Sequence, residues 1–126
     1  RGLEHLGLLD YRDTGALYRS CDVGVALTLS EHPSYLPLEF MACGTPVVAF
    51  DNPAGDWILH HEQNSLRCPR TVDGLADALT RLATDGALRR TLGEQGVADI
   101  AARHGDWDAA LRDVYPFLCD PSAGTP

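Results

Sequence analysis

The pattern that most constrains the fold is the alternation of short apolar segments with turn-forming residues in the first half of the chain. In segment 22–29, large side chains share one face and small ones the other, which is typical of a central strand covered on both faces. The large face comprises Val23, Val25, Leu27 and Leu29, and the small face Gly24, Ala26 and Thr28. We expect a polar loop at 30–34, a helix over 35–43 and a β-branched strand at 46–50 to follow. This order predicts a parallel pair of strands, because parallel strands need a crossover connection.

Helix 35–43 has clear end signals. Gly44 suits a left-handed cap, and Pro37 falls in the first turn if Ser34 is the N-cap, where a missing N–H costs little. Further strands are expected at 3–9 and 64–68, and further helices from Thr14, from Thr71, over 86–104 and from Asp106, with Pro116 kinking or ending the last.

The 126 residues suit one domain. Strands alternating with helices predict an α/β fold with a Rossmann-like parallel sheet, spanning 1–118 and followed by a flexible tail at 119–126. Ligands of such sheets bind outside the carboxyl ends of the strands, where the loops 30–34 and 51–55 are expected to lie.

Charge and composition narrow the partners. The ten cationic side chains are all Arg, and 18 acidic ones give a formal net charge of −8. The sequence has no basic stripe, so we expect no nucleic-acid partner. The spacing of the four cysteines gives no zinc pattern, and no signal peptide is visible, so we expect no metal and a cytoplasmic setting.

Two carboxylates seven residues apart carry the functional signal. Glu31 lies in the loop before the helix, and Glu39 lies within the helix among apolar residues, where a carboxylate needs hydrogen bonds. Hydroxyls of a ribose would satisfy Glu39, while the N–H groups of Tyr35 and Leu36 would point at a phosphate. On spacing alone a plainer interpretation stays open, in which Glu31 only complements the helix dipole and Glu39 is exposed.

The segment Ser30–Phe50 resembles the signature of retaining GT-B glycosyltransferases of family 4 (group 1). That signature has Ser-Glu, seven residues, Glu, and then Ala-x-Gly-x-Pro-Val-Val-Ala. Its counterparts here are Glu31, Glu39, Ala42, Gly44, Pro46, Val47, Val48 and Ala49. The likeness extends over about residues 3–118 and implies the C-terminal, nucleotide-sugar-binding half of a GT-B fold.

The resemblance assigns roles to individual residues. Glu39 would bind the ribose of the donor, and Glu31 would contact hydroxyls of the donor sugar, which makes it the candidate catalytic residue. The backbone at Ser34, Tyr35 and Leu36 would approach the sugar and diphosphate, and Leu6 and Gly7 would lie near the base. Ser34-Tyr35 replaces the family's usual Phe-Gly, and Pro37 removes a donor, so the phosphate cradle is altered.

The form His-Pro-Ser-Tyr-x-Pro-Leu-Glu resembles a rhamnosyltransferase-like subgroup that builds bacterial surface glycans. It implies transfer of a hexosyl or rhamnosyl group from a nucleotide diphosphate sugar to a glycan or lipid-linked acceptor, with dTDP-rhamnose as the implied donor. No separate cofactor is implied. The setting would be cytoplasmic, with peripheral attachment to the inner face of the membrane through an acceptor-binding N-terminal domain that this chain lacks.

The same resemblance places the family's diphosphate-neutralising Arg/Lys pair upstream of this chain. We therefore expect the isolated chain to catalyse no transfer and to bind nucleotides weakly at best. Segment 3–9 would lack its usual neighbouring strands, so it would pair beside 22–29, pair with another copy, or stay unpaired.

Other candidates have plainer explanations. His60-His61-Glu62 could suggest a metal site but is more typical of a solvated turn, and His32 could act as a base but suits a loop role. Trp107 suits a core or interface better than a sugar platform. Two other function classes stay open: a non-enzymatic α/β binding or regulatory module, and half of a sugar-nucleotide epimerase.

Overall fold

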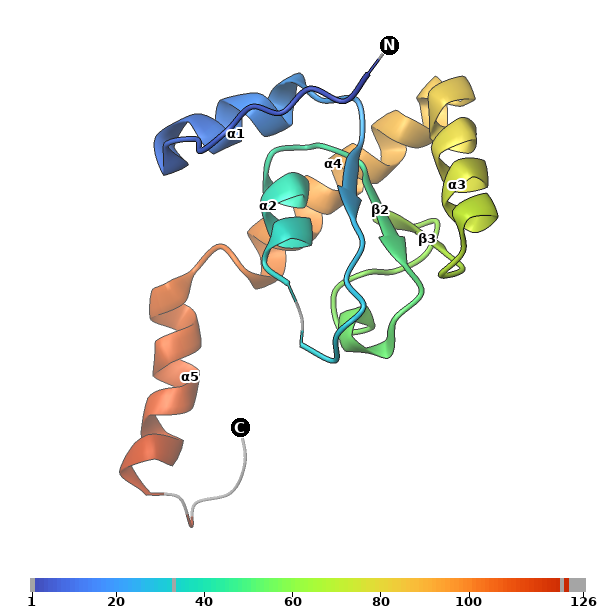
Figure 1. Ribbon diagram of the computed structural model, residues 1–126. Coiled ribbons are helices and arrows are strands. Elements are labelled where there is room, and N and C mark those ends of the chain that lie inside the picture. The colour runs from blue at the N-terminus through green and yellow to red at the C-terminus, as the bar shows by residue number, and fades with distance from the viewer. Residues whose placement is uncertain (1, 33, 121, 123–126) are drawn as a thin grey trace.

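Three parallel strands form the centre of the fold, in the order β1-β2-β3, in a computed structural model that describes residues 2–32, 34–120 and 122 (Figure 1). The elements are α1 (Tyr11–Ser20), β1 (Gly24–Ala26), α2 (Leu36–Ala42), β2 (Val47–Phe50), the 3₁₀ turn η1 (Pro53–Gly55), β3 (Ser65–Cys68), α3 (Val72–Thr84), α4 (Gly86–Arg103) and α5 (Trp107–Cys119). The α/β class and the parallel sheet expected from the sequence are confirmed.

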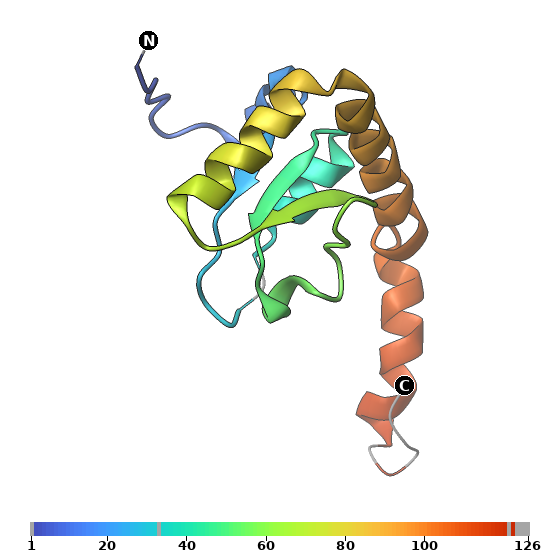
Figure 2. The same cartoon turned by 90° about the vertical axis from the view of Figure 1, so that its right-hand side faces the viewer.

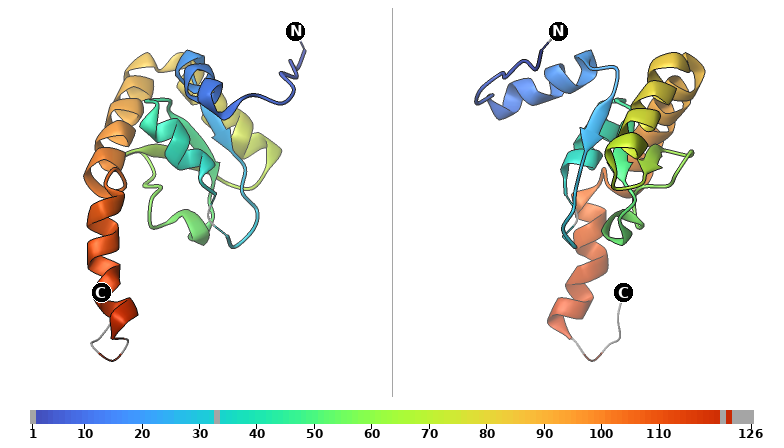
Figure 3. Two further views of the ribbon diagram at one scale, coloured as in Figure 1. Left: turned by 90° about the vertical axis from the view of Figure 1, so that its left-hand side faces the viewer. Right: turned by 45° about the vertical axis from the view of Figure 1, so that its right-hand side comes forward.

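The central strand β2 divides the core into two clusters. Val47 and Ala49 pack on the side of α2, whereas Val48 packs on the side of α3. This follows from the strand geometry, because successive side chains point to opposite faces. Helices α2 and α3 accordingly lie on opposite sides of the sheet (Figures 1 and 3). Helix α4 joins the two clusters, with Leu92 in one and Ile100 packed against the other.

The connection between α2 and the sheet was predicted correctly. A Cβ placed on Gly24 would lie 2.5 Å from the Phe40 ring, so only glycine lets α2 approach β1 this closely. Gly44 has φ +74°, and the N–H of Thr45 donates to the Phe40 carbonyl over 2.9 Å. These are the features of a left-handed Schellman ending, which turns the chain directly into β2.

The expected strand at 3–9 is wrong. This segment has no strand pairing among the described residues, and its leucines are exposed, with Leu8 fully so. Of the three arrangements considered for it, the structure has the unpaired one, and the segment runs away from the body of the fold (Figure 2). Strand β1 is consequently at the edge of the described sheet, and the predicted strand stops at Ala26, which leaves Leu27 and Leu29 exposed.

Helix starts differ from expectation at two positions. The side chain of Asp10, rather than Thr14, caps α1, and α2 begins after Tyr35 instead of Ser34. The predicted cap at Thr71 is confirmed, because its hydroxyl accepts from the N–H of Gly74. The helix expected from about Asp106 is also confirmed, and the carboxylate of Asp106 accepts from the N–H of Ala109.

Helix α5 projects from the body of the fold, and none of its residues is buried (Figures 1 and 3). It continues past Pro116 to Cys119, so the proline does not end it. The expected tail at 119–126 starts in the last turn of α5, and its residues 121 and 123–126 lie outside the described residues. None of the helices in the described part of the chain is long and apolar enough to cross a bilayer.

Candidate functional site

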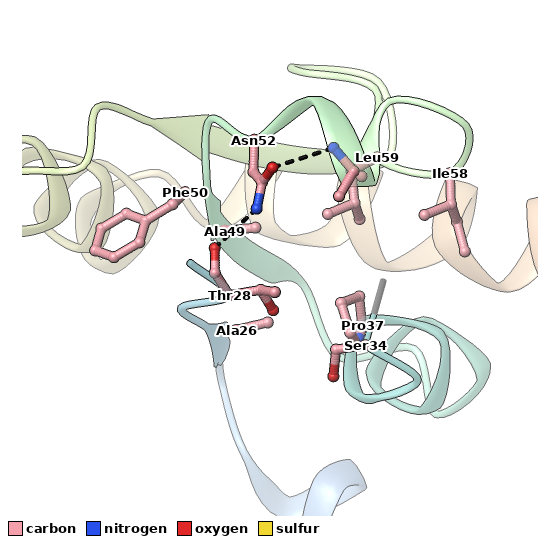
Figure 4. A pocket seen from close by; sticks show the side chains of 11 residues that line it. Ala26, Thr28, Ser34, Pro37, Ala49, Phe50, Asn52, Ile58 and Leu59 are labelled. Atoms are coloured by element: carbon pink, nitrogen blue, oxygen red, sulfur yellow. Dashed lines mark hydrogen bonds between the residues drawn. The ribbon is translucent and has the colours of Figure 1, made fainter. Parts of the chain in front are cut away.

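The carboxyl ends of β1 and β2 are joined by one buried amide. The Nδ2 group of Asn52 donates to the carbonyl of Thr28 over 3.1 Å and to that of Ser30 over 2.9 Å, while its Oδ1 accepts from the N–H of Ala54 over 3.1 Å. Asn52 is only 9% exposed, and Figure 4 shows it reaching from one strand-end loop toward the other. Asn52 therefore fixes how the two expected ligand loops sit relative to each other.

Arg67 of β3 holds the second of these loops. Its guanidinium lies 2.5 Å from Asp51 Oδ1 and 2.7 Å from Asp56 Oδ1, and it also donates to the carbonyl oxygens of Asn52 and Leu59. The hydrogen-bonding groups of this half-buried Arg are paired with two carboxylates and two carbonyls. Arg67 therefore holds the loop after β2 in a fixed position. Neither Asn52 nor Arg67 was expected at the site from the sequence pattern.

A pocket of about 30 Å³ lies between these strand ends and the start of α2. Ser34, Pro37 and Asn52 are among its walls, and its volume suits about one water molecule (Figure 4). A nucleotide sugar does not fit there.

A larger cleft of about 660 Å³ lies on the outer side of α2, where the end of α4 meets the start of α5. It is lined by Tyr11, Tyr35, Leu38, Glu39, Ala42, Trp57, Ile100, Arg103, His104, Asp106, Trp107 and Ala110. This volume falls in the range of about 300–1,000 Å³ that is usual for small-molecule sites. The lining is aromatic and apolar with a few charged groups, which is the usual composition of a pocket for a polar organic ligand.

Glu39 lies in the wall of this cleft and is half-buried. The hydroxyl of Tyr18 on α1 donates to Glu39 Oε2 over 3.1 Å. The ring of Tyr18 meets Phe40 edge-on, with centroids 4.8 Å apart. The expectation that this carboxylate is hydrogen-bonded within an apolar setting is met, by a tyrosine that sequence analysis did not single out.

The same contact acts on Tyr18. Burial raises the pKa of the Tyr18 phenol, and its hydrogen bond to the negative Glu39 carboxylate raises the pKa further. The phenol therefore stays a hydrogen-bond donor across the physiological pH range.

Trp57 links the strand-end loop to the far wall of the cleft. Its indole N–H donates to the Ala54 carbonyl over 3.0 Å, and its ring meets His104 edge-on at 5.5 Å. The loop after β2 and the end of α4 are therefore held together across the cleft.

Residues 1–80 match the family model described as "WsaF, C-terminal domain". The chain belongs to the WsaF C-terminal domain family. It is 42% identical over 98% of its length to the O-antigen biosynthesis protein RfbC of Myxococcus xanthus, of which it covers 10%. It is 30% identical over 87% of its length to the chitobiosyldiphosphodolichol beta-mannosyltransferase of Candida albicans, of which it covers 25%.

Solved structures agree with this placement. The sucrose-phosphate synthase of Thermosynechococcus elongatus matches 94% of this chain at 28% identity with a TM-score of 0.77, and the match covers 30% of that synthase. The WsaF-type domain thus has the fold of GT-B glycosyltransferase C-terminal domains, and its relatives include glycosyltransferases. The chain spans about a tenth to a quarter of the curated relatives named above.

The structure brings together only some of the residues expected at the donor site of this WsaF-type domain. Glu39 and Tyr35 share the large cleft, and Ser34 lines the small pocket. Glu31 is exposed and lines neither cavity, as is true of Leu6 and Gly7 in the unpaired segment.

The expected phosphate cradle at the start of α2 is weaker than the sequence suggested. The N–H of Leu36 is not free, because it donates to the Ser34 hydroxyl over 3.2 Å, and its side chain packs against the core. Pro37 offers no N–H, and α2 spans only seven residues. The start of α2 therefore offers fewer backbone donors to an anion than a longer helix without proline would.

His61 and Glu62 make local contacts in the segment before β3. His61 Nδ1 accepts from the N–H of Arg67, and Glu62 pairs with Arg81. Within residues 2–32, 34–120 and 122, no group of three or more potential ligands is placed to hold a metal ion. His32 is exposed in the loop before α2. Trp107 is 73% exposed at the edge of the large cleft, so its expected placement in a core is wrong, because α5 projects from the body of the fold.

Proposed function

We propose that this chain is the donor-binding part of a glycosyltransferase, which transfers a hexosyl or rhamnosyl group from a nucleotide diphosphate sugar to a glycan or lipid-linked acceptor. One observation carries the proposal: the second glutamate of the Glu-x₇-Glu segment is half-buried in the wall of the large cleft and is held there by Tyr18. The family and the GT-B fold support it.

Glu39 would bind the nucleoside through the hydroxyls of its pentose. A carboxylate accepts hydrogen bonds from hydroxyls strongly, and a partly desolvated one does so with less competition from water. In the described part of the chain Oε2 has Tyr18 as its donor, and no hydrogen bond reaches Oε1. Oε1 is the atom that we assign to the nucleoside.

The remaining roles need more of the protein than these cavities. Glu31 would contact the transferred sugar as the catalytic residue, and Leu6 and Gly7 would lie near the base. We propose that an N-terminal domain completes the site, binds the acceptor, supplies cations to the diphosphate, and attaches the enzyme to the cytoplasmic face of the membrane. The chain alone would then transfer no sugar, because positioning and charge stabilisation provide most of the rate.

A donor panel tests the binding role. Thermal unfolding of the chain is measured with millimolar dTDP-, UDP- and GDP-sugars, since any ligand that binds the folded state alone raises the unfolding temperature. We expect dTDP-rhamnose to give the largest rise, and Glu39→Ala to abolish it. Glu94→Ala, which removes an exposed carboxylate on α4, is the matched control and should retain the rise. Equal rises in wild type and Glu39→Ala would contradict the assignment.

A labelled-donor assay tests the expected inactivity. The chain is incubated with isotope-labelled dTDP-rhamnose and a lipid-linked glycan, with heat-inactivated chain as the control. Label in the acceptor above that control would show that the chain needs no second domain.

A further inference from the structure

The hydrogen-bonded ladder between β1 and β2 is continued by a side chain. The last backbone pair of this ladder is Ala26 and Ala49. Beyond it, the Asn52 amide donates both of its N–H bonds, one to the carbonyl of Thr28 and one to that of Ser30 (Figure 4). Carbonyls two residues apart in an extended segment point to the same neighbouring strand, so one side-chain amide here replaces two backbone donors.

Asn52 is itself held in place. Its Oδ1 accepts from the N–H of Ala54, and its carbonyl accepts from the N–H of Gly55 over 2.9 Å and from Arg67 of β3 over 3.3 Å. Because Asn52 is nearly buried, water competes little for these hydrogen bonds. The loop after β1 is therefore anchored, through Asn52, to the loop after β2 and to β3.

Glu31 follows directly after the second carbonyl that Asn52 holds. Residues 28–32 belong to neither a helix nor a strand, so side-chain contacts such as that of Asn52 decide where this backbone lies. Glu31 is exposed, and the position of Ser30 therefore sets which region its carboxylate can reach. That position matters for binding, because a misplacement of about 1 Å is costly for a group that contacts a ligand.

We propose that Asn52 is a positioning residue for Glu31, and that by holding the loop after β1 it sets how tightly the chain binds the transferred sugar of its donor. This rests on the proposed function, in which Glu31 contacts the sugar and Glu39 binds the nucleoside. Asn52 acts through Glu31, so the affinity for the nucleotide part alone should not depend on Asn52.

The test compares a donor with its nucleotide alone. Dissociation constants of dTDP-rhamnose and dTDP are measured by NMR titration of the 126-residue chain and of Asn52→Ser. Serine can still accept from the N–H of Ala54, as a cap residue does, but its side chain is too short to reach the loop after β1. Thr71→Ala is the control for lost stability, because it removes the cap of α3 and lines neither the small pocket nor the large cleft.

We expect the wild-type chain to bind dTDP-rhamnose more tightly than dTDP. Asn52→Ser should lower that preference by about fivefold, the worth of one net hydrogen bond, and should leave the affinity for dTDP as it is in wild type. Thr71→Ala should keep the wild-type preference. An unchanged preference in Asn52→Ser, or an equal loss of affinity for the two ligands, overturns the proposal.

A double-mutant cycle decides whether Asn52 acts through Glu31. Glu31→Ala removes the carboxylate that is proposed to contact the sugar. Adding Asn52→Ser to Glu31→Ala should then lower the preference for dTDP-rhamnose no further. A further loss in the double variant would mean that Asn52 affects the sugar by another route, which contradicts the positioning role.

A measurement without ligand separates this inference from the proposed function. Backbone ¹⁵N relaxation reports the order parameters of the Ser30 and Glu31 amides on the picosecond to nanosecond timescale. We expect both order parameters to be lower in Asn52→Ser than in wild type, and equal values overturn the inference even if the donor binds. If dTDP does not bind the wild-type chain, the proposed function fails and the inference fails with it. If dTDP and dTDP-rhamnose bind equally tightly, the inference fails while the role of Glu39 stands.

Discussion

Asn64 and Asp99 are joined by a hydrogen bond in which Asn64 Nδ2 donates to Asp99 Oδ2 over 2.7 Å. Asn64 is 1% exposed, and it also donates to the Ile58 carbonyl and accepts from the N–H of His60. One buried amide thus ties the loop before β3 to α4, whose last turn lines the large cleft. The position of that wall depends on a residue outside the cleft.

Asn64→Ala should therefore destabilise the fold. The change leaves a buried carbonyl and N–H without partners, which costs about 2–4 kcal/mol in the free energy of unfolding. Urea unfolding followed by circular dichroism measures it. Gln63→Ala, at the exposed neighbouring position, should change that free energy by less than about 0.5 kcal/mol. Equal effects of the two substitutions would show that the amide network contributes little.

Asp99 should contribute to acid sensitivity. Burial raises its pKa, but hydrogen bonds from Asn64 and Gln95 outweigh burial, and the net pKa lies below the ordinary value of 3.8. A carboxyl with a lowered folded pKa stabilises the fold above its unfolded pKa, and this stabilisation is lost as the pH falls through the folded pKa. The free energy of unfolding of Asp99→Asn should hence fall less steeply than that of wild type below about pH 4. If the free energy of unfolding fell equally steeply below pH 4 in the two proteins, this role of Asp99 would be refuted.

Gly93→Ala should loosen the contact between α4 and the turn that ends α2. A Cβ there would lie 2.5 Å from the carbonyl oxygen of Gly44, so the backbone must shift, at a cost of about 1–3 kcal/mol. Gly86→Ala, at the start of the same helix, meets only the end of the Arg89 side chain at 3.8 Å and should be neutral or slightly stabilising. Thermal unfolding of both variants measures the difference, and a stable Gly93→Ala would mean that α4 can move away freely.

Tyr18 should make the free energy of unfolding fall at alkaline pH. Burial, followed by the bond to Glu39, raises the pKa of the phenol above its ordinary value of 10.0. The stabilisation is complete below that value and is lost as the pH rises through the folded pKa. The stability of Tyr18→Phe should thus decline less than that of wild type above pH 10. A matched Tyr115→Phe change, at an exposed position on α5, should leave the decline in stability above pH 10 the same as in wild type.

The parts of the fold that the sequence predicted well rest on local chemistry. The small face of 22–29, the left-handed turn at Gly44 and the cap at Thr71 each follow from a few neighbouring residues. The expected strand at 3–9 failed for a non-local reason. Its apolar pattern suits a strand, but a strand needs a partner for its backbone, and none pairs with this segment among the described residues.

The candidate site was predictable only in part for the same reason. Glu39 stands out because a carboxylate within an apolar helix needs an explanation. Tyr18, Asn52 and Arg67 act through contacts with residues that are 8 to 24 positions away in the chain, which no periodicity or spacing shows. The Ser34 hydroxyl accepts from the N–H of Leu36 and so competes locally with a phosphate for that donor, which the spacing of the motif does not show.

The most direct test of the central claim is a titration of the isotope-labelled chain with millimolar dTDP-sugar, followed by amide chemical shifts in wild type and Glu39→Ala. We expect saturable shifts in wild type that centre on the Tyr35 and Glu39 side of the large cleft and vanish in Glu39→Ala. Shifts that persist unchanged in Glu39→Ala, or no saturable shift in wild type, would contradict the claim that this carboxylate binds the donor nucleoside.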